Sequence, residues 1–287
     1  MKHWFKLVSV CVVLVSSLVS VPARSDDVPA IAAASNIKFA LDEIASQFTQ
    51  DTGRKVNISY GSSGNFVAQI RHGAPFQLFL SADEKYIHQL QKYDASLGEG
   101  TLYAVGRLAI AAPKYSPLEL DPELEGLKSL LKAGKLQRFA IANPDHAPYG
   151  ERAREVLQGL GLWDSLKPKL IYGENVSQAA QFAVSGSTQG GLIALSLAIA
   201  PQFQAMGHYK VIPEALHTPL TQRMILTSKA GETAKVFYQY LQSDSARQVF
   251  SDFGFGLPEP DQSETVKPAL VKSKLVKPEL SQPETGN

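Results

Sequence analysis

The sequence predicts an α/β protein of two lobes with a ligand cleft between them. Short apolar segments alternate with segments of helical periodicity, and this alternation occurs in two stretches of about a hundred residues each. Strand–helix–strand units of this kind form right-handed parallel crossovers, with helices covering the sheet. The chain has 287 residues, of which 44% are hydrophobic, so each lobe can bury a core of its own.

The first 25 residues have the pattern of a secretory signal peptide. Two lysines precede an apolar run at 7–19, small residues follow the run, and residues 1–25 contain no acidic side chain. The run is shorter than the ~20 residues that a membrane-spanning helix needs. We therefore expect cleavage, after Ala23 or after Ser25, rather than a permanent anchor. The predicted location of the mature protein is the periplasm.

The mature chain is expected to contain no thiol and to be weakly acidic. Cleavage after Ser25 removes Cys11, the single cysteine, together with three of the 28 basic residues and none of the 27 acidic ones. The formal net charge then changes from +1 to −2. A lipid-modified Cys11 is the alternative, but Val10 before it is bulkier than the small residue of a usual lipoprotein signal. Without a basic excess we expect no nucleic-acid partner, and we expect a monomer.

The first unit predicts three strands, each followed by a helix. The strands are expected at 28–34, 56–60 and 78–80, and their helices run from 37 to 53, through 70, and over 86–90. In the first helix, apolar residues recur at helical spacing from Ile37 to Phe48, and Gly53 ends the run.

The second unit predicts two further strand–helix pairs and leaves one segment open. The strands are expected at 139–142 and 169–172, followed by helices that carry 153–160 and 176–183. Residues 191–200 fit a strand or a buried helix equally well. Residues 102–112 and 218–228 are predicted as extended segments that pass between the lobes, and 234–241 and 246–250 as terminal helices.

These elements predict a discontinuous first lobe, a second lobe and a tail. The first lobe is expected to comprise 26–104 and 218–257, and the second 105–217. Residues 258–287 hold five of the 17 prolines, many charged residues and no aromatic one. Such a segment buries too little apolar surface to offset its ordering entropy, so we predict a disordered tail. A tail that docks on a partner is the less favoured alternative.

Polar and small residues stand at four predicted junctions between a strand and the next helix. The junctions are 34–36, 61–64, 146–150 and 174–177. Serine and asparagine commonly cap helices, which explains any one of them. Ligands of parallel sheets, however, gather at the carboxyl ends of strands, where helix N-termini offer free N–H groups and partial positive charge. Four such junctions facing one cleft predict a site for a fully ionised tetrahedral oxyanion, which has only acceptor atoms.

Several short motifs occur in a fixed order along the chain. They are AAAS at 32–35, YGSS at 60–63, APFQLFLSAD at 74–83, NPDHAP at 143–148, AKVFYQYL at 234–241 and FGF at 253–255. Taken together, they resemble the periplasmic molybdate-binding protein family, the solute receptors of molybdate ABC transporters. The resemblance covers about 31–255. It implies the type II periplasmic binding protein fold, with each lobe a mixed sheet flanked by helices. It also implies capture of molybdate, and of tungstate, for a permease at the inner membrane, with no cofactor and no enzymatic activity.

The resemblance assigns the ligand contacts to particular residues. They are Ser35, Asn36, Ser63, Tyr149 and Val176. The two serines correspond to family residues that bind the oxyanion through hydroxyl and amide groups, and the last two residues to backbone N–H donors. Several family members have a ligand-binding tyrosine where Ala194 stands here. Our hypothesis is that the Tyr149 hydroxyl replaces it and that the Asn36 amide is a further donor; whether more than the Tyr149 N–H contacts the ligand stays open.

Other functions are disfavoured by the same residues. Ser63 is a poor candidate for a hydrolase nucleophile, because the sequence around it lacks the G-x-S-x-G pattern and no spacing indicates an accompanying base. A regulator's effector domain would not carry a signal peptide and would need a helix-turn-helix segment. The six histidines form no cluster, so no metal-cation site is predicted, and His146 is expected to order its loop. Sulfate or another tetrahedral oxyanion is the nearest rival ligand.

Overall fold

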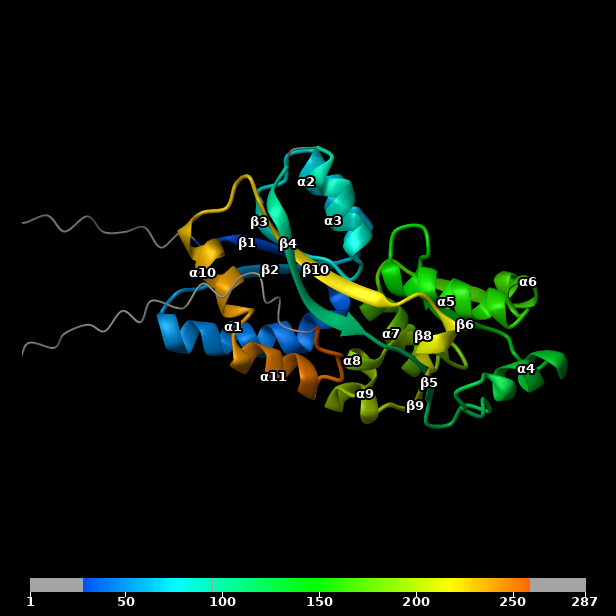
Figure 1. The fold of residues 1–287 in the computed structure, drawn as a ribbon. Coiled ribbons are helices and arrows are strands. Elements are labelled where there is room, and N and C mark those ends of the chain that lie inside the picture. The colour runs from blue at the N-terminus through cyan, green and yellow to red at the C-terminus, as the bar shows by residue number, and fades with distance from the viewer. Residues whose placement is uncertain (1–27, 94, 259–287) are drawn as a thin grey trace, which may run out of the picture. The chain divides into compact units, whose positions relative to one another are not determined.

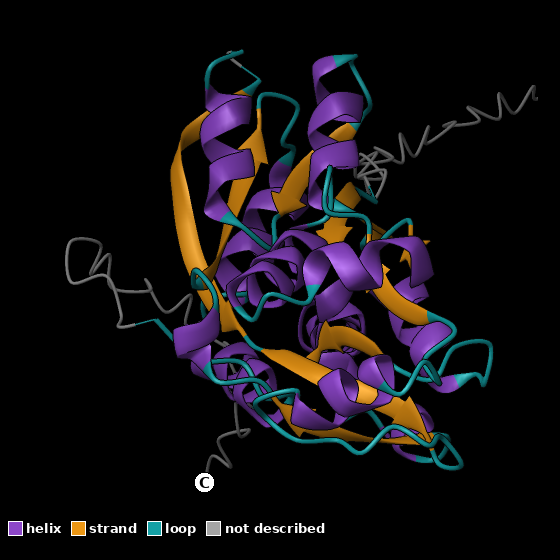
Figure 2. Ribbon diagram, turned by 90° about the vertical axis from the view of Figure 1, so that its right-hand side faces the viewer, coloured by secondary structure: helices purple, strands orange, loops and turns teal. Residues whose placement is uncertain are grey.

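The computed structural model describes residues 28–93 and 95–258. The predicted signal peptide at 1–25, and all but the first residue of the predicted tail, lie outside the described residues. The described chain forms two lobes, each built on a five-stranded sheet with helices on both sides (Figures 1 and 2). The predicted two-lobed α/β class is therefore confirmed. Among the described residues, no helix is both long and apolar enough to cross a bilayer.

The first lobe has a mixed sheet with the strand order β2-β1-β3-β10-β4. The first three strands are parallel, and β10 runs antiparallel to both of its neighbours. The strands are β1 (Ala30–Ala34), β2 (Asn57–Gly61), β3 (Phe76–Leu80), β4 (Ser96–Gly106) and β10 (Leu220–Thr227). The helices are α1 (Lys38–Thr52), α2 (Ser63–Arg71), α3 (Glu84–Gln91), α10 (Glu232–Tyr240) and α11 (Asp244–Asp252), with a 3-10 turn, η1 (Ser35–Ile37), after β1.

The second lobe repeats this plan with the strand order β7-β6-β8-β5-β9. Its strands are β5 (Leu108–Pro113), β6 (Phe139–Ala142), β7 (Leu170–Gly173), β8 (Gly191–Ala194) and β9 (Gly207–Val211). Its helices are α4 (Glu125–Lys132), α5 (Pro148–Gly159), α6 (Trp163–Leu166), α7 (Val176–Val184), α8 (Leu195–Ala198) and α9 (Pro201–Gln204), with 3-10 turns η2 (Lys167–Lys169) and η3 (Glu214–Leu216). Strand β6 is parallel to β7 and β8, whereas β5 is antiparallel to β8 and β9.

Alternation along β1 explains why its short apolar run lies in the middle of a sheet. Successive side chains of a strand point to opposite faces. Ile31 and Ala33 accordingly join the core formed with α1 and α11, while Ala32 joins the core formed with α2 and α3. Helix α1 ends where Gly53 adopts a left-handed φ of 71°, as the sequence predicts. A strand buried on both faces needs apolar residues at every position, which is what this segment provides.

Several segments differ from the prediction or complete it, among them the following three. The open segment 191–200 contains both alternatives, strand β8 followed directly by helix α8. The prediction omits α4, although Leu127 and Leu130 show helical spacing there. It also omits β9, an edge strand that is exposed at three of its five positions and so carries no apolar pattern.

The chain passes between the lobes along paired strands. Strand β4 of the first sheet is separated from β5 of the second by Arg107 alone, and the chain returns between Val211 and Leu220. Figure 1 shows β4 and β10 side by side as they lead toward the second sheet. The predicted extended segments are thus present, while the predicted lobe boundaries stay predictions.

Candidate functional site

All five residues predicted to bind the ligand line one small cavity between the lobes. The cavity is small, with a volume of about 10 Å³. The residues are Ser35, Asn36, Ser63, Tyr149 and Val176, joined by Ser62. They come from the carboxyl ends of β1 and β2 in the first lobe and from the N-termini of α5 and α7 in the second. The structure therefore brings the predicted residues together, and their contact with a ligand stays a prediction.

Ser35 reaches the cavity because η1 begins directly at the end of β1. Its hydroxyl oxygen accepts a hydrogen bond from the backbone N–H of Ser177 at 3.2 Å, and the Ser177 hydroxyl donates to the Ser35 carbonyl at 2.9 Å. Both contacts join the lobes. Since the Ser35 oxygen accepts, its own proton is left over, and no described residue accepts it. A buried hydroxyl of this kind can donate to an anion.

Ser63, in the first turn of α2, also has a hydroxyl whose oxygen accepts a backbone N–H. The residue is fully buried, and its hydroxyl oxygen accepts the backbone N–H of Ala82 at 3.0 Å. Its proton likewise has no acceptor among the described residues. The contact also bears on the hydrolase alternative, because the partner of this hydroxyl is an amide and not an imidazole base.

The Tyr149 hydroxyl lies in a buried polar network rather than free in the cavity. It is 3.4 Å from the Asn36 side-chain nitrogen and 3.3 Å from the Gln222 side-chain nitrogen. Burial raises the pKa of this phenol above its ordinary value of 10.0, and the two hydrogen bonds from Gln222 and Asn36 oppose that shift. The hydroxyl is therefore neutral at physiological pH and keeps its proton.

Two features of this network indicate how the amides are oriented. The Asn36 oxygen Oδ1 is buried and has no partner among the described residues. The Tyr103 hydroxyl, which has one proton, lies within donating distance of both the Ser81 carbonyl, at 3.0 Å, and the Gln222 oxygen, at 2.9 Å. With the amide atoms in these positions, the Asn36 oxygen has no donor within the described chain, and the single Tyr103 proton lies between two acceptors.

Turning both side-chain amides by 180° gives every group of the network a partner except the Asn36 N–H₂. Gln222 then donates to Tyr103 and to Asn36, at the positions 2.9 and 3.0 Å away, and accepts the Tyr149 proton. The Asn36 N–H₂ takes the unpaired position and is left as a donor. An amide's orientation is decided by such a network, because its oxygen and nitrogen are nearly the same size. The network thus leaves one donor for a ligand. This donor is the Asn36 N–H₂ if both amides are turned, and the Tyr149 hydroxyl if they are not.

Backbone N–H groups complete the donor set. Val176 is the first residue of α7. The side-chain oxygen of Asn175 accepts the N–H groups of Ser177 and Gln178, at 3.0 and 3.1 Å, so this cap does not use the Val176 N–H. In α5, Pro148 occupies the first position and Tyr149 follows it. First-turn N–H groups have no partner within their helix, and each helix adds partial positive charge at this end.

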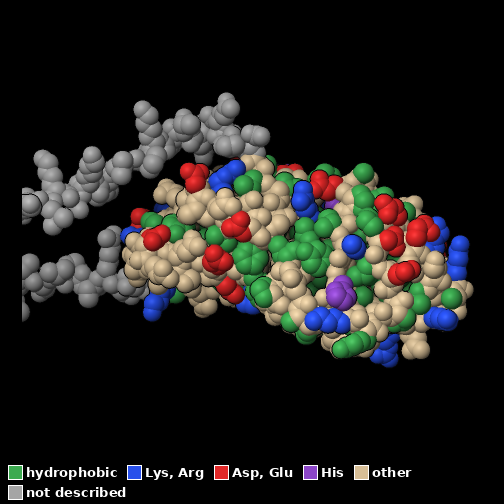
Figure 3. Space-filling model, turned by 90° about the horizontal axis from the view of Figure 1, so that it is seen from below, with side chains coloured by type: hydrophobic (Ala, Val, Ile, Leu, Met, Phe, Trp, Pro, Cys, Tyr) green, Lys and Arg blue, Asp and Glu red, His purple; other side chains and the backbone are tan. Residues whose placement is uncertain are grey.

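No charged side chain lines the cavity within the described residues. Lys38 instead pairs with Asp42 at 2.8 Å on the surface, and Arg152 pairs with Asp83 at 2.7 Å. Among the described residues, no group of three His, Cys, Asp or Glu side chains could hold a cation. On the face that Figure 3 shows, acidic and basic side chains are interspersed. The cavity is therefore a set of neutral donors, suited to hydrogen-bond an anion.

Sequence reasoning missed three members of this region. Gln222 is fully buried in the middle of β10, and a polar residue inside an apolar strand was the available signal. Ser62 seemed a helix cap, and His146 was expected only to order its own loop. In the structure their side chains meet across the lobes, with 2.9 Å between the serine oxygen and the ring nitrogen Nδ1.

Comparison with known proteins agrees with this architecture. The family model of bacterial extracellular solute-binding proteins matches residues 30–256. The chain is 34% identical to the molybdate-binding protein ModA of Azotobacter vinelandii, over 88% of this chain and 99% of that one. It is 32% identical to the ModA of Escherichia coli, over 78% of this chain and 86% of that one.

Solved structures give the same result. The periplasmic molybdate-binding protein of Azotobacter vinelandii matches with a TM-score of 0.73 at 30% identity, over 80% of this chain and all of that one. The sulfate-binding protein SubI of Mycobacterium tuberculosis matches with a TM-score of 0.68 at 14% identity, which shows a shared fold. The predicted periplasmic binding protein fold and the resemblance are thereby confirmed. The chain belongs to the family of bacterial extracellular solute-binding proteins.

Proposed function

We propose that this protein captures molybdate outside the cytoplasm and delivers it to the permease of an ABC transporter. The observation that carries the proposal is the pair of buried hydroxyls, Ser35 and Ser63. Their oxygens accept N–H donors, which leaves their protons free to donate into a cavity without charged lining residues. Relatives named for molybdate, similar over most of their length, indicate which oxyanion is meant. The proposal includes export by the predicted signal peptide, a monomeric receptor without a cofactor, and no catalytic activity.

The donor set explains why a fully ionised oxyanion is favoured over phosphate. A fully ionised oxyanion has only acceptor atoms, whereas phosphate at neutral pH keeps a proton that needs an acceptor. With the amides turned, the cavity offers hydroxyl, amide and backbone donors and no carboxylate among the residues that line it. Charge-assisted hydrogen bonds contribute about 1.5–3 kcal/mol each, so several of them support tight binding. Tungstate has the same shape and charge, and we expect it to compete.

The first test is thermal denaturation of the mature protein with and without molybdate. A ligand that binds only the folded chain stabilises it by about 4 kcal/mol at a thousandfold excess over Kd. For a chain of this size we expect the Tm to rise by about 8–16 °C. Competition calorimetry with tungstate, sulfate and phosphate then ranks the ligands. No Tm shift at saturating molybdate, or tighter binding of sulfate than of molybdate, would contradict the proposal.

The second test separates the two residues of the polar network that can donate. With the amides turned, Asn36 donates to the oxyanion and the Tyr149 hydroxyl serves Gln222. We therefore expect Asn36→Ala to weaken molybdate binding by about tenfold or more, and Tyr149→Phe to weaken it by less than about threefold. Isothermal titration calorimetry measures both. A larger loss of affinity in Tyr149→Phe than in Asn36→Ala would show that the amides are not turned and that the Tyr149 hydroxyl contacts the ligand. An unchanged affinity for Tyr149→Phe leaves this residue its backbone N–H alone.

A further inference from the structure

Ser62 occupies the N-cap position of α2 but does not cap the helix. Its backbone is extended, and its side chain accepts no N–H from the first turn. The side chain is buried, lines the cavity, and lies with its oxygen 2.9 Å from Nδ1 of His146 in the other lobe. The hydroxyl therefore has a different task from the one that its position in the sequence indicates.

The contact between Ser62 and His146 is held by the backbone as well. The N–H of Gly64 donates to the His146 carbonyl at 2.9 Å. A Cβ atom at Gly64 would lie 2.8 Å from that same oxygen, so only glycine permits this approach. The loop that carries the histidine is thus docked directly on the N-terminus of α2, and the imidazole is fixed against the serine.

A carboxylate lies on the far side of the ring. Nε2 of His146 is 3.8 Å from one oxygen of Glu174, and the other oxygen of Glu174 accepts a hydrogen bond from Asn65 of the first lobe. A carboxylate in this position favours a proton on Nε2. The direction of the Ser62 proton then depends on whether Nδ1 also carries one.

Two arrangements follow from the donor and acceptor rules. With a proton on Nε2 alone, Nδ1 is an acceptor, and the Ser62 hydroxyl must donate to it. The serine then turns only lone pairs toward the cavity, which repel an anion. With protons on both nitrogens, Nδ1 donates to the Ser62 oxygen, and the hydroxyl proton becomes free to donate to the ligand.

We propose that Ser62 is a further ligand-binding hydroxyl and that His146 is the positioning residue that directs its proton. Capture of a doubly negative oxyanion is then accompanied by uptake of one proton from the buffer at the imidazole. The added positive charge and the redirected hydroxyl both favour the bound anion. This inference rests on the proposed function and adds a proton linkage to it.

One charged side chain contacts the ring among the described ion pairs. Glu174 faces it from the second lobe, and the neighbouring Asp145 lies 3.9 Å from Arg154. Helix α2 packs against it from the first lobe and carries no charged residue before Arg71, its last position. The bound oxyanion is thus the main new charge that the imidazole meets when a ligand enters.

The test is calorimetry of the mature protein with molybdate in buffers of different ionisation enthalpy, which reports protons taken up. We expect proton uptake on binding and an affinity that falls as the pH rises, because the complex holds the additional proton. His146→Gln should abolish the uptake and leave an affinity independent of pH. Ser62→Ala should weaken binding by about ten- to a hundredfold.

A matched control lies at the opposite end of α2. His72 is the exposed residue after α2, and its ring contacts only the Ala68 carbonyl among the contacts described, at 2.7 Å. His72→Gln should leave the proton uptake unchanged. Proton NMR of the His146 ring in the unaltered protein, with and without molybdate at pH 8, keeps the test independent of how the variants fold; a doubly protonated ring in the complex is expected.

The possible failures are distinguishable. Molybdate binding without proton uptake and without pH dependence would overturn this inference and leave the proposed function intact. No binding at any pH would overturn the proposed function. Ser62, His146 and Glu174 also follow the order of a nucleophile, a base and a carboxylate. Hydrolysis of a nitrophenyl ester that is lost in Ser62→Ala would therefore make the serine a nucleophile and overturn its role as a donor.

Discussion

The double substitution Ser35→Ala with Ser63→Ala is expected to lower the affinity for molybdate by about a hundred- to ten-thousandfold. Each serine supplies one charge-assisted hydrogen bond, worth about 1.5–3 kcal/mol, and two such bonds correspond to that range. The effect is large because the cavity has no cationic side chain among its described lining residues to attract the ion in another way. Calorimetry on the two single variants and the double variant measures it.

The same experiment needs a control for stability, because both hydroxyls also accept an N–H. Losing the acceptor at Ser63 leaves the buried N–H of Ala82 unpaired, which costs about 1–3 kcal/mol of folding free energy. Denaturation of the unliganded variants measures this cost separately from binding. Ser46→Ala, at an exposed position of α1, is the matched control and should change neither quantity. If the double variant binds within about threefold of the unaltered protein, hydroxyl donation is wrong as the basis of recognition.

The strands and the junctions could be predicted because their signals are local. The apolar run that ends at Ala34 and the glycine at position 53 fix β1 and the end of α1 within a few residues of sequence. Ser35 and Ser63 could be named because each stands where a buried strand gives way to a helix, and because the family resemblance carries the same two serines. Which N–H groups donate to these two hydroxyls required the structure, since their partners Ser177 and Ala82 belong to other elements.

The remaining contacts could not be predicted because they join positions far apart in the chain. Ser62 and His146 are 84 residues apart, and Asn36 and Gln222 are 186 apart. Neither pair leaves a periodic pattern, and a serine before a helix is explained equally well by capping. Strand β9 was not predicted for a related reason, because an exposed edge strand has no apolar face and leaves no periodic pattern in the sequence.

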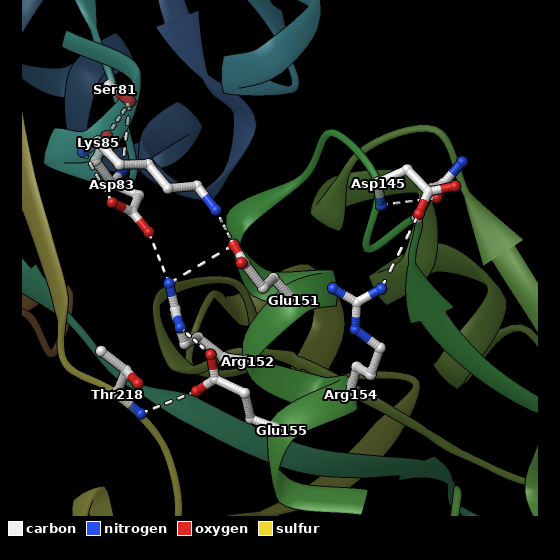
Figure 4. A network of polar contacts seen from close by, with 10 residues as sticks. Ser81, Asp83, Lys85, Asp145, Glu151, Arg152, Arg154, Glu155 and Thr218 are labelled. Carbon is white, nitrogen blue, oxygen red and sulfur yellow. Dashed lines mark hydrogen bonds and ion pairs between the residues drawn. The ribbon is translucent and has the colours of Figure 1, made fainter. Parts of the chain in front are cut away.

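A second region between the lobes is built from charges rather than neutral donors. Arg152 of α5 has a side chain that is 6% exposed, and its Nη2 lies 2.7 Å from Asp83 of the first lobe, which is 9% exposed. Figure 4 shows the guanidinium also reaching Glu151 and Glu155, and Lys85 of the first lobe reaching Glu151. One buried cation thus holds several carboxylates at the boundary between the lobes.

Arg152→Met is the second substitution with a large expected effect. It leaves the buried carboxylate of Asp83 without its partner, and breaking a buried pair costs about 3–5 kcal/mol. Because the pair joins the lobes, the cost falls on the arrangement described here, in which the lobes are in contact. An arrangement in which the lobes have moved apart and water reaches Asp83 then gains population. We expect the affinity for molybdate to fall by up to about a hundred- to several-thousandfold. Small-angle scattering of the unliganded variant should show a larger radius of gyration.

The chain offers a matched control on the same helix. Arg154 is 34% exposed, and its contact to Asp145, at 3.9 Å, stays within the second lobe. An exposed pair contributes about 1 kcal/mol at most, so Arg154→Met should change the affinity by less than about fivefold. A double-mutant cycle with Asp83→Asn isolates the pair, since asparagine can still accept the N–H of Lys85 as the cap of α3. A coupling energy near zero would show that Arg152 acts through packing alone and that the ion pair does not hold the lobes closed.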